Sequence, residues 1–195
     1  DLIVEISYID GCLKISNTGT FFDEDGIKAI VQGNNSPKKG KYIGNKGTGF
    51  RSILNWASSV RIFSGEFAVE FSKSYAKEIF DTIKDTPQIA KQLQREKTLY
   101  IPMLAVPKNI PHDRPIDRTT IEVDVDPKKS QDEYSVRKQL ETIDLRILLF
   151  LPNVSEISIT TDDKHVVYQR SKTDLLIESD FSWSDITLSK VVDNE

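Results

Sequence analysis

Residues 2–17 read LIVEISYIDGCLKISN, two runs of alternating apolar and polar residues on either side of Asp10-Gly11. Alternation with a period of two is typical of a strand with one buried face, and Asp-Gly is a strong signal for a type I′ hairpin turn. The pattern therefore predicts an antiparallel pair of strands. Their apolar face must be buried against other elements of the same domain.

Further stretches carry the same strand signal. Residues 59–72 predict a hairpin joined at Ser64-Gly65, residues 119–126 predict a single strand, and residues 154–170 predict a hairpin around Asp162-Asp163-Lys164. Two shorter apolar runs, residues 99–106 and 174–179, are further strand candidates, whereas residues 107–118 hold three prolines and predict a loop.

Helical patterns separate these strands. Residues 22–33 predict a helix that Asp23 caps and Gly33 ends, and residues 48–56 predict another. Residues 73–96 predict a charged helix interrupted at Pro87, and residues 132–151 predict the clearest helix, which runs up to Pro152. The order of elements predicts an α+β fold, a two-layer sandwich of a mixed, mainly antiparallel sheet with helices on one face.

Composition excludes several classes of function. The chain has one cysteine and two histidines, too few for an internal disulfide and poor material for a zinc cluster or a Ser-His-Asp triad. A net charge of -4 argues against general nucleic-acid affinity. No apolar run approaches the roughly 20 residues that span a bilayer, and the first residues do not resemble a signal peptide. We expect a cytoplasmic protein with no membrane partner.

The most distinctive motif is KYIGNKGTGFRSIL, residues 41–54, which follows a polar loop rich in lysine. Its glycine spacing fits neither a dinucleotide fingerprint, nor a Walker A loop, nor a protein-kinase loop. Backbone N–H groups of Gly47, Thr48 and Gly49 at the start of a helix nevertheless favour an anion such as phosphate. A flexible turn within a solvated basic loop is the alternative.

Two motifs in order carry a resemblance: ISNTGTFFDEDGIKAI, and then YIGNKGTGFRSIL. Together they resemble the nucleotide-binding core of the GHKL superfamily, which includes DNA gyrase, heat-shock chaperones of the ninety-kilodalton class, sensor histidine kinases and MutL. The sacsin-like branch is the most similar, and LLFLPNVSEISI resembles the segment that closes the domain there. The resemblance covers most of residues 2–160, implies a Bergerat-type fold, and leaves residues 161–195 as strands that complete or extend this domain.

The resemblance implies a role for each matching residue. Asn17 stands where most members have an Asp that accepts a hydrogen bond from the adenine amino group, and Gly19 lets the backbone approach the base. Phe21 replaces a second glycine of that turn. Thr119 matches a strand threonine that reaches the base, although Arg118 replaces the glycine usually before it.

The phosphate half of the site follows in the same way. The backbone from Gly44 to Phe50 would cradle the phosphates, with Lys38 and Lys46 as cations. The set of nucleotide-binding residues that the resemblance implies is Asn17, Gly19, Lys38, Gly44, Lys46, Gly47, Thr48, Gly49, Phe50 and Thr119. Residues 33–47 would form a lid over bound ATP.

Family members bind Mg²⁺ through an Asn and activate water through a Glu, both on a helix with a Glu-x-x-x-Asn pattern before the first hairpin. The sequence reaches the first strand directly after Asp1, so we expect those catalytic and metal-binding residues upstream of it and poor hydrolysis from this stretch alone. The resemblance implies an ATP-driven conformational switch in a larger protein that is chaperone-like or defence-associated. The switch would act on other domains of the same protein or on a second copy of the chain in a homodimer.

Two alternatives remain open. The departures at Asn17 and Phe21 are compatible with a degenerate, nucleotide-free protein-interaction domain. A histidine-kinase-like phosphotransferase is less favoured, because neither His112 nor His165 stands in a predicted helical hairpin.

Overall fold

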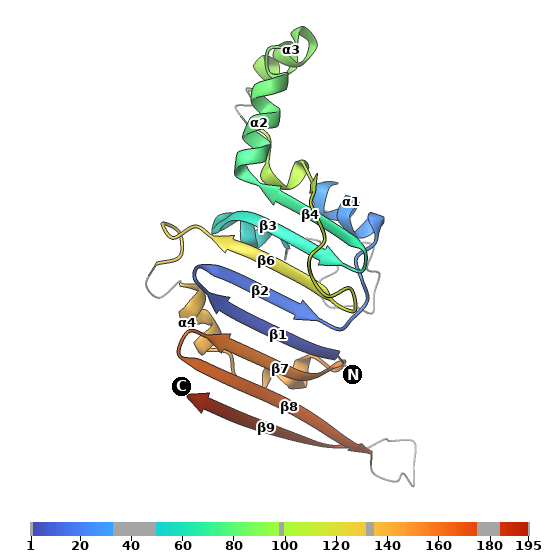
Figure 1. Ribbon diagram of the computed structural model, residues 1–195, viewed down its shortest axis with the longest axis vertical. Helices are drawn as coiled ribbons and strands as arrows, with labels where there is room; N and C mark the ends of the chain where they lie inside the picture. The colour runs from blue at the N-terminus through green and yellow to red at the C-terminus, as the bar shows by residue number, and fades with distance from the viewer. Residues whose placement is uncertain (1, 33–49, 98–99, 132–134, 175–183, 195) are drawn as a thin grey trace.

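The computed structural model describes residues 2–32, 50–97, 100–131, 135–174 and 184–194. Over these ranges the chain builds one nine-stranded sheet in the order β5-β4-β3-β6-β2-β1-β7-β8-β9 (Figure 1). The strands are β1 (Leu2–Ile9), β2 (Cys12–Asn17), β3 (Ala57–Ser64), β4 (Phe67–Ser72), β5 (Lys108–Asn109), β6 (Thr119–Val125), β7 (Val154–Thr161), β8 (Lys164–Asp174) and β9 (Ser184–Asn194). The helical segments are α1 (Glu24–Gln32), η1 (Phe50–Asn55), α2 (Lys73–Ile83), α3 (Pro87–Glu96), η2 (Met103–Ala105), α4 (Val136–Glu141) and α5 (Ile147–Phe150), of which η1 and η2 are 3₁₀-helices.

The sheet is mixed and mainly antiparallel, as the strand patterns predicted, and the α+β class agrees with it. Among the described pairs, β1 and β7 run parallel and the others antiparallel. Asp10 and Gly11 have φ values of 50° and 77°, so the β1–β2 turn has the two positive φ angles of the predicted type I′ turn.

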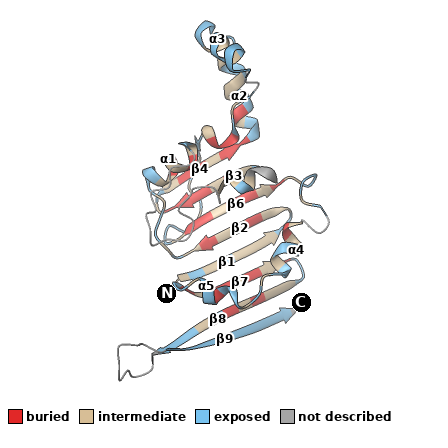
Figure 2. Cartoon of the chain, turned by 180° about the vertical axis from the view of Figure 1, so that it is seen from behind, coloured by how far each residue is buried: buried red, intermediate tan, exposed pale blue. Residues whose placement is uncertain are grey.

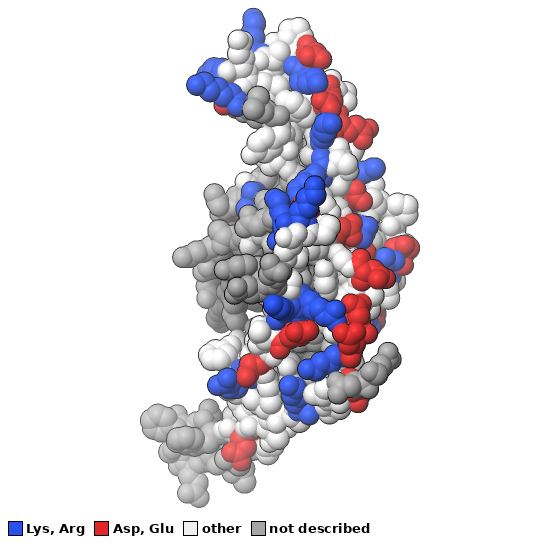
Figure 3. Space-filling view, turned by 90° about the vertical axis from the view of Figure 1, so that its left-hand side faces the viewer, with Lys and Arg blue, Asp and Glu red and all other residues white. Residues whose placement is uncertain are grey.

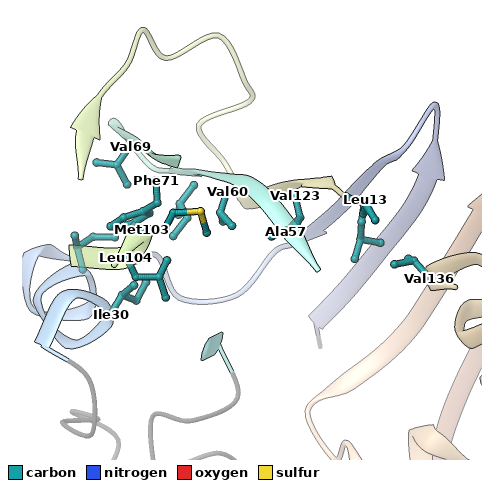
Figure 4. Close-up of a cluster of buried hydrophobic side chains, with 13 residues drawn as sticks. Leu13, Ile30, Ala57, Val60, Val69, Phe71, Met103, Leu104, Val123 and Val136 are labelled. Carbon is teal, nitrogen blue, oxygen red and sulfur yellow. The ribbon is translucent and has the colours of Figure 1, made fainter. Parts of the chain in front are cut away.

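One face of the sheet carries the hydrophobic cores. Alternate residues of β2, β3 and β6, among them Leu13, Val60 and Val123, form a first core with Ile27 and Ile30 of α1 (Figure 4). Because a strand exposes every second side chain to the same face, these residues share one side of the sheet. Helix α1 thereby covers the half of the sheet that holds β3, β4 and β6.

A second core lies over β1, β7 and β8 on the same face. Leu148 of α5 is fully buried against Ile157 and Ile159 of β7, and Tyr168 of β8 donates a hydrogen bond from its hydroxyl to the Ile143 carbonyl at 2.8 Å. Figure 2 shows α4 and α5 in front of these strands, whereas α2 and α3 extend beyond the sheet at β4. Helix α3 has no buried residue.

The opposite face is polar. Register pairs connect one residue from each strand into a line that crosses the sheet. Residues 107–118, predicted as a loop, contain the short strand β5; the segment after it folds onto this face, with His112 against Phe63 at 5.6 Å between ring centroids. Figure 3, with this face toward the right, shows the acidic and basic side chains along it. This line of paired residues on the polar face consists of Lys108, Glu70, Arg61, Glu122, Lys14, Ser7, Thr160, His165 and Asp193.

The prediction of one helix over residues 132–151 is wrong. The described part, from Ser135, holds two short helices, α4 and α5, separated by a turn. Asp144 explains the break, because its carboxylate accepts hydrogen bonds from the Arg146 backbone N–H at 2.8 Å and from Arg146 Nε at 2.7 Å. A side chain that binds backbone groups two residues ahead offers the chain an alternative to continuing the helix.

Two other local predictions are corrected. The apolar run 99–106 is not a strand in its described part but contains η2, which follows Pro102, a residue with no N–H to donate to a sheet. The helix expected from Thr48 is the 3₁₀-helix η1. By contrast, α1, the break at Pro87 and the strands β6, β7 and β8 are confirmed.

The sequence did not reveal β9, which pairs with β8 over eleven residues and forms an edge of the described sheet. The strand predicted at residues 174–179 lies outside the described residues except for Asp174, the last residue of β8. Strands β8 and β9 extend the sheet, while the division of the chain at residue 160 stays a prediction. Among the described helices, none is long and apolar enough to cross a bilayer.

Candidate functional site

Three polar residues from three neighbouring strands meet at one end of the sheet, on the face that carries the helices. Asn17, the last residue of β2, pairs with Thr119, the first residue of β6, and Thr119 pairs in turn with Ser64, the last residue of β3. Two of the predicted site residues, Asn17 and Thr119, are far apart in sequence and directly opposite in the sheet. We call Asn17, Thr119 and Ser64 the polar row.

Ser64 belongs to the polar row although the sequence did not single it out. Its Oγ lies 2.7 Å from Thr119 Oγ1 and accepts a hydrogen bond from the Phe22 backbone N–H at 2.8 Å. Ser64 and Thr119 are only 2% and 1% exposed. The hydrogen bonds therefore connect the segment that enters α1 to the end of β6 through two buried hydroxyls.

Gly19 completes a tight turn next to Asn17. The Gly19 N–H donates to Asn17 Oδ1 at 3.0 Å, and a Cβ at Gly19 would lie 2.9 Å from that same oxygen. Such a contact is too short, so a side chain at position 19 would force Asn17 Oδ1 to move. Thr18 fixes the turn to β1, because its Oγ1 accepts a hydrogen bond from the Ile3 N–H at 3.1 Å.

Phe21 and Arg118, which depart from the motifs of the resemblance, contact other parts of the fold. Phe21 is 45% exposed and its ring lies over Gly65 in the β3–β4 turn. Arg118 binds Glu5 at 2.8 Å on the polar face of the sheet and also contacts Asp117. The hydrogen bond from Arg118 lowers the pKa of Asp117, which keeps this pair charged.

The predicted phosphate-binding residues lie outside the described residues, with one exception. These are Lys38, Gly44, Lys46, Gly47, Thr48 and Gly49. The exception, Phe50, begins η1 and packs its half-buried ring against the first core. Arg51 donates hydrogen bonds to the carbonyls of Ile30 and Val31 at 3.2 and 3.4 Å. The residues that directly precede and follow segment 33–49 therefore lie beside one another.

No catalytic cluster accompanies the polar row in the described residues. Burial raises the pKa of the Cys12 thiol, and the charges of Asp124 and Glu122 raise it further. The thiol is therefore a poor nucleophile at neutral pH, because the thiolate is the reactive form. Within the described ranges, no three His, Cys, Asp or Glu side chains are grouped so that they could hold a metal ion.

Comparison with known proteins adds no assignment. No protein-family model matches the chain, and no curated protein matches it. The interpretation of the site therefore depends on its geometry and chemistry.

Proposed function

We propose that this chain is an ATP-binding module of the Bergerat type, in which the polar row holds the adenine. The observation that carries the proposal is the pairing of Asn17 with Thr119 across β2 and β6, beside a turn in which Gly19 leaves room for Asn17 Oδ1. A base needs polar groups that are held in place before it arrives, because ordering them on binding costs affinity. The hydrogen bonds of Gly19, Phe22 and Ser64 hold them in this way.

Each residue has a chemical part in the proposal. Asn17 Oδ1 keeps a second lone pair, which can accept a hydrogen bond from the adenine amino group. The Thr119 hydroxyl can exchange a hydrogen bond with a ring nitrogen, directly or through water. The backbone from Gly44 to Phe50, with Lys38 and Lys46, would bind the phosphates, and Arg51 joins the end of that segment to α1.

The proposal extends to a conformational switch. ATP would place its base at the polar row and its phosphates at the backbone from Gly44 to Phe50, under a lid formed by residues 33–47. It would so connect α1 to the sheet. A ligand shifts an equilibrium only by its difference in affinity for the two states, so this bridging would favour the closed arrangement. In the intact protein, closure would act on neighbouring domains or on a second copy of the chain.

Magnesium would accompany the triphosphate and neutralise its charge. Within the described residues, no group of three His, Cys, Asp or Glu side chains could hold the metal ion. No hydrolytic step is assigned to the described residues.

The neighbouring residues Thr119 and Thr120 provide a matched test. Both are 1% exposed and each pairs with a serine hydroxyl, Thr119 with Ser64 on the helix face and Thr120 with Ser16 at 3.0 Å on the polar face. Calorimetric titration of the full-length protein with a non-hydrolysable ATP analogue and Mg²⁺ measures affinity. We expect Thr119→Val to weaken binding about tenfold, the loss of one buried hydrogen bond, and Thr120→Val to change it less than about twofold.

Both variants lose a buried hydroxyl pair, so a common effect on folding cancels in the comparison. Equal losses of affinity in the two variants would contradict a base site at Thr119. Absence of binding at millimolar analogue would contradict the nucleotide proposal as a whole.

A nucleotide-free interaction domain is the second candidate, because apolar side chains are exposed elsewhere. Phe150 and Leu149 of α5 are 74% and 47% exposed, and Val191 of β9 is 52% exposed. The titration separates the two functions: an interaction domain gives no heat with the nucleotide, and Phe150→Ser would abolish its function while leaving its fold intact.

A further inference from the structure

Asn17 carries an amide where an aspartate would carry a carboxylate, and its hydrogen bond shows how that amide is oriented. Its Oδ1 accepts the hydrogen bond from the Gly19 N–H, which fixes which side-chain atom is the oxygen, because a backbone N–H can only donate. Among the hydrogen bonds of the described residues, the one made to the Asn17 amide comes from the Gly19 N–H. Besides the lone pair used there, the amide carries two N–H donors and a second lone pair on Oδ1.

A carboxylate at this position would offer acceptors alone. Such a group suits a 6-aminopurine, whose exocyclic nitrogen donates, and rejects a 6-oxopurine, whose oxygen only accepts. The amide of Asn17 suits both, because the exocyclic amine can donate to Oδ1 and the exocyclic oxygen can accept from Nδ2. The Gly19 hydrogen bond holds the amide plane, so neither base requires the side chain to flip.

The buried hydroxyls of Ser64 and Thr119 allow a similar choice between donating to a ring nitrogen of the base and accepting from it. Ser64 Oγ accepts from the Phe22 N–H, and either hydroxyl can donate the 2.7 Å hydrogen bond between Ser64 Oγ and Thr119 Oγ1. When Ser64 donates, the Thr119 proton can go to a ring acceptor; when Thr119 donates, its oxygen keeps a lone pair for a ring N–H. Thr119 can therefore face an unprotonated ring nitrogen or a protonated one.

We propose that Asn17 makes the base site tolerant: it accepts 6-oxopurine triphosphates, such as GTP and ITP, about as well as ATP. The inference rests on the proposed function and concerns the same site. Asn17 is the specificity-determining residue, and Asn17→Asp is expected to convert the site to one that selects adenine.

Calorimetric titration of the full-length protein with ATP, GTP and ITP, each with Mg²⁺, tests the inference. We expect the three dissociation constants of the natural protein to agree within about threefold. In Asn17→Asp, we expect GTP and ITP to bind about 30-fold more weakly than ATP, because a carboxylate then faces an oxygen with no proton between them. ITP lacks the 2-amino group of GTP, so similar losses for both locate the effect at position 6 of the ring.

Two controls protect the interpretation. Asp at position 17 can still accept the Gly19 hydrogen bond, so the thermal midpoint of Asn17→Asp should match that of the natural protein. Asn109→Asp, at an exposed position of β5, adds the same charge away from the site and should leave the three affinities in their original ratio.

The outcomes separate the inference from the function on which it rests. If all three nucleotides fail to bind, both the inference and the function are overturned. If ATP binds the natural protein at least about 30-fold more tightly than GTP, the nucleotide site stands and tolerance through Asn17 is wrong. Equal affinities that stay equal in Asn17→Asp also overturn the role of Asn17.

Discussion

Ser64 gives the most informative stability experiment, because its single buried hydroxyl binds two partners. In Ser64→Ala the Phe22 N–H loses its acceptor at 2.8 Å and the Thr119 hydroxyl loses its partner at 2.7 Å. Each buried polar group left without a partner costs about 1–3 kcal/mol. Phe22 is half-buried, so water can replace part of the hydrogen bond that its N–H loses. We therefore expect Ser64→Ala to lower the free energy of unfolding by about 2–3 kcal/mol.

Urea denaturation measures the loss, which should lower the midpoint by about 1 M at a typical slope. Ser58→Ala is the control, because the Ser58 hydroxyl is exposed and donates only to the Asp124 carbonyl at 3.1 Å; its effect should stay within about 0.5 kcal/mol. In the double variant Ser64→Ala/Thr119→Val, the two losses should fall short of additive by about 1 kcal/mol, because no hydroxyl is left unpaired. A Ser64→Ala loss below about 0.5 kcal/mol would refute the hydrogen-bonding argument for the polar row.

Three further predictions concern other parts of the chain. Gly19→Ala places a methyl group 2.9 Å from Asn17 Oδ1, so nucleotide affinity should fall at least about tenfold in a titration; unchanged affinity would contradict the close turn. Glu122→Gln removes the ion pairs with Arg61 at 3.1 Å and Arg114 at 2.7 Å, and should cost about 2 kcal/mol in chemical denaturation, since both arginines are partly exposed; a neutral result would show that the pairs contribute nothing net. The hydrogen bonds of Arg146 lower the pKa of Asp144 from 3.8 to about 2. A carboxyl whose pKa is lower in the folded state stabilises the fold at pH values above its unfolded-state pKa. That contribution is lost as the pH falls through the folded-state pKa. The NMR titration midpoint of Asp144 should therefore lie near 2 and rise toward 3.8 in Arg146→Ala, and a midpoint unaffected by the substitution would contradict the assignment.

The sequence predicted best where local signals and tertiary packing agree. The β1–β2 hairpin follows from alternation around Asp10-Gly11, whose positive φ angles the turn needs. The break at Pro87 follows from a residue that cannot continue a helix but starts one well, and Pro87 is the first residue of α3.

It failed where a side chain competes with the backbone or where a partner strand decides. Asp144 ends the helical pattern by binding the backbone of Arg146, a contact that apolar periodicity does not report. Strand β9 depends on pairing with β8, and its exposed Ile186 and Val192 give no clean buried stripe. An edge strand is stabilised by hydrogen bonds from its neighbour more than by burial of its own side chains.

For the site, sequence reasoning selected Asn17, Gly19 and Thr119, and the structure brings these together at one end of the sheet. The hairpin pattern alone predicts Ser64 in the turn beside Gly65. Its position, the last residue of a strand in register with the first residue of β6, becomes apparent only when β3 and β6 are paired. The sequence signal is a serine at the end of a predicted strand. It can be interpreted only when the order of the strands in the sheet is known.

Amide NMR spectra of the protein, recorded as a non-hydrolysable ATP analogue and Mg²⁺ are added, test the central claim most directly. The account predicts saturable shifts at Gly19, Phe22 and Thr119, which surround the proposed base site, and none at Lys128 in the turn after β6. Spectra in which those three amides stay still at millimolar analogue, or move no more than Lys128, would contradict a nucleotide site at the polar row.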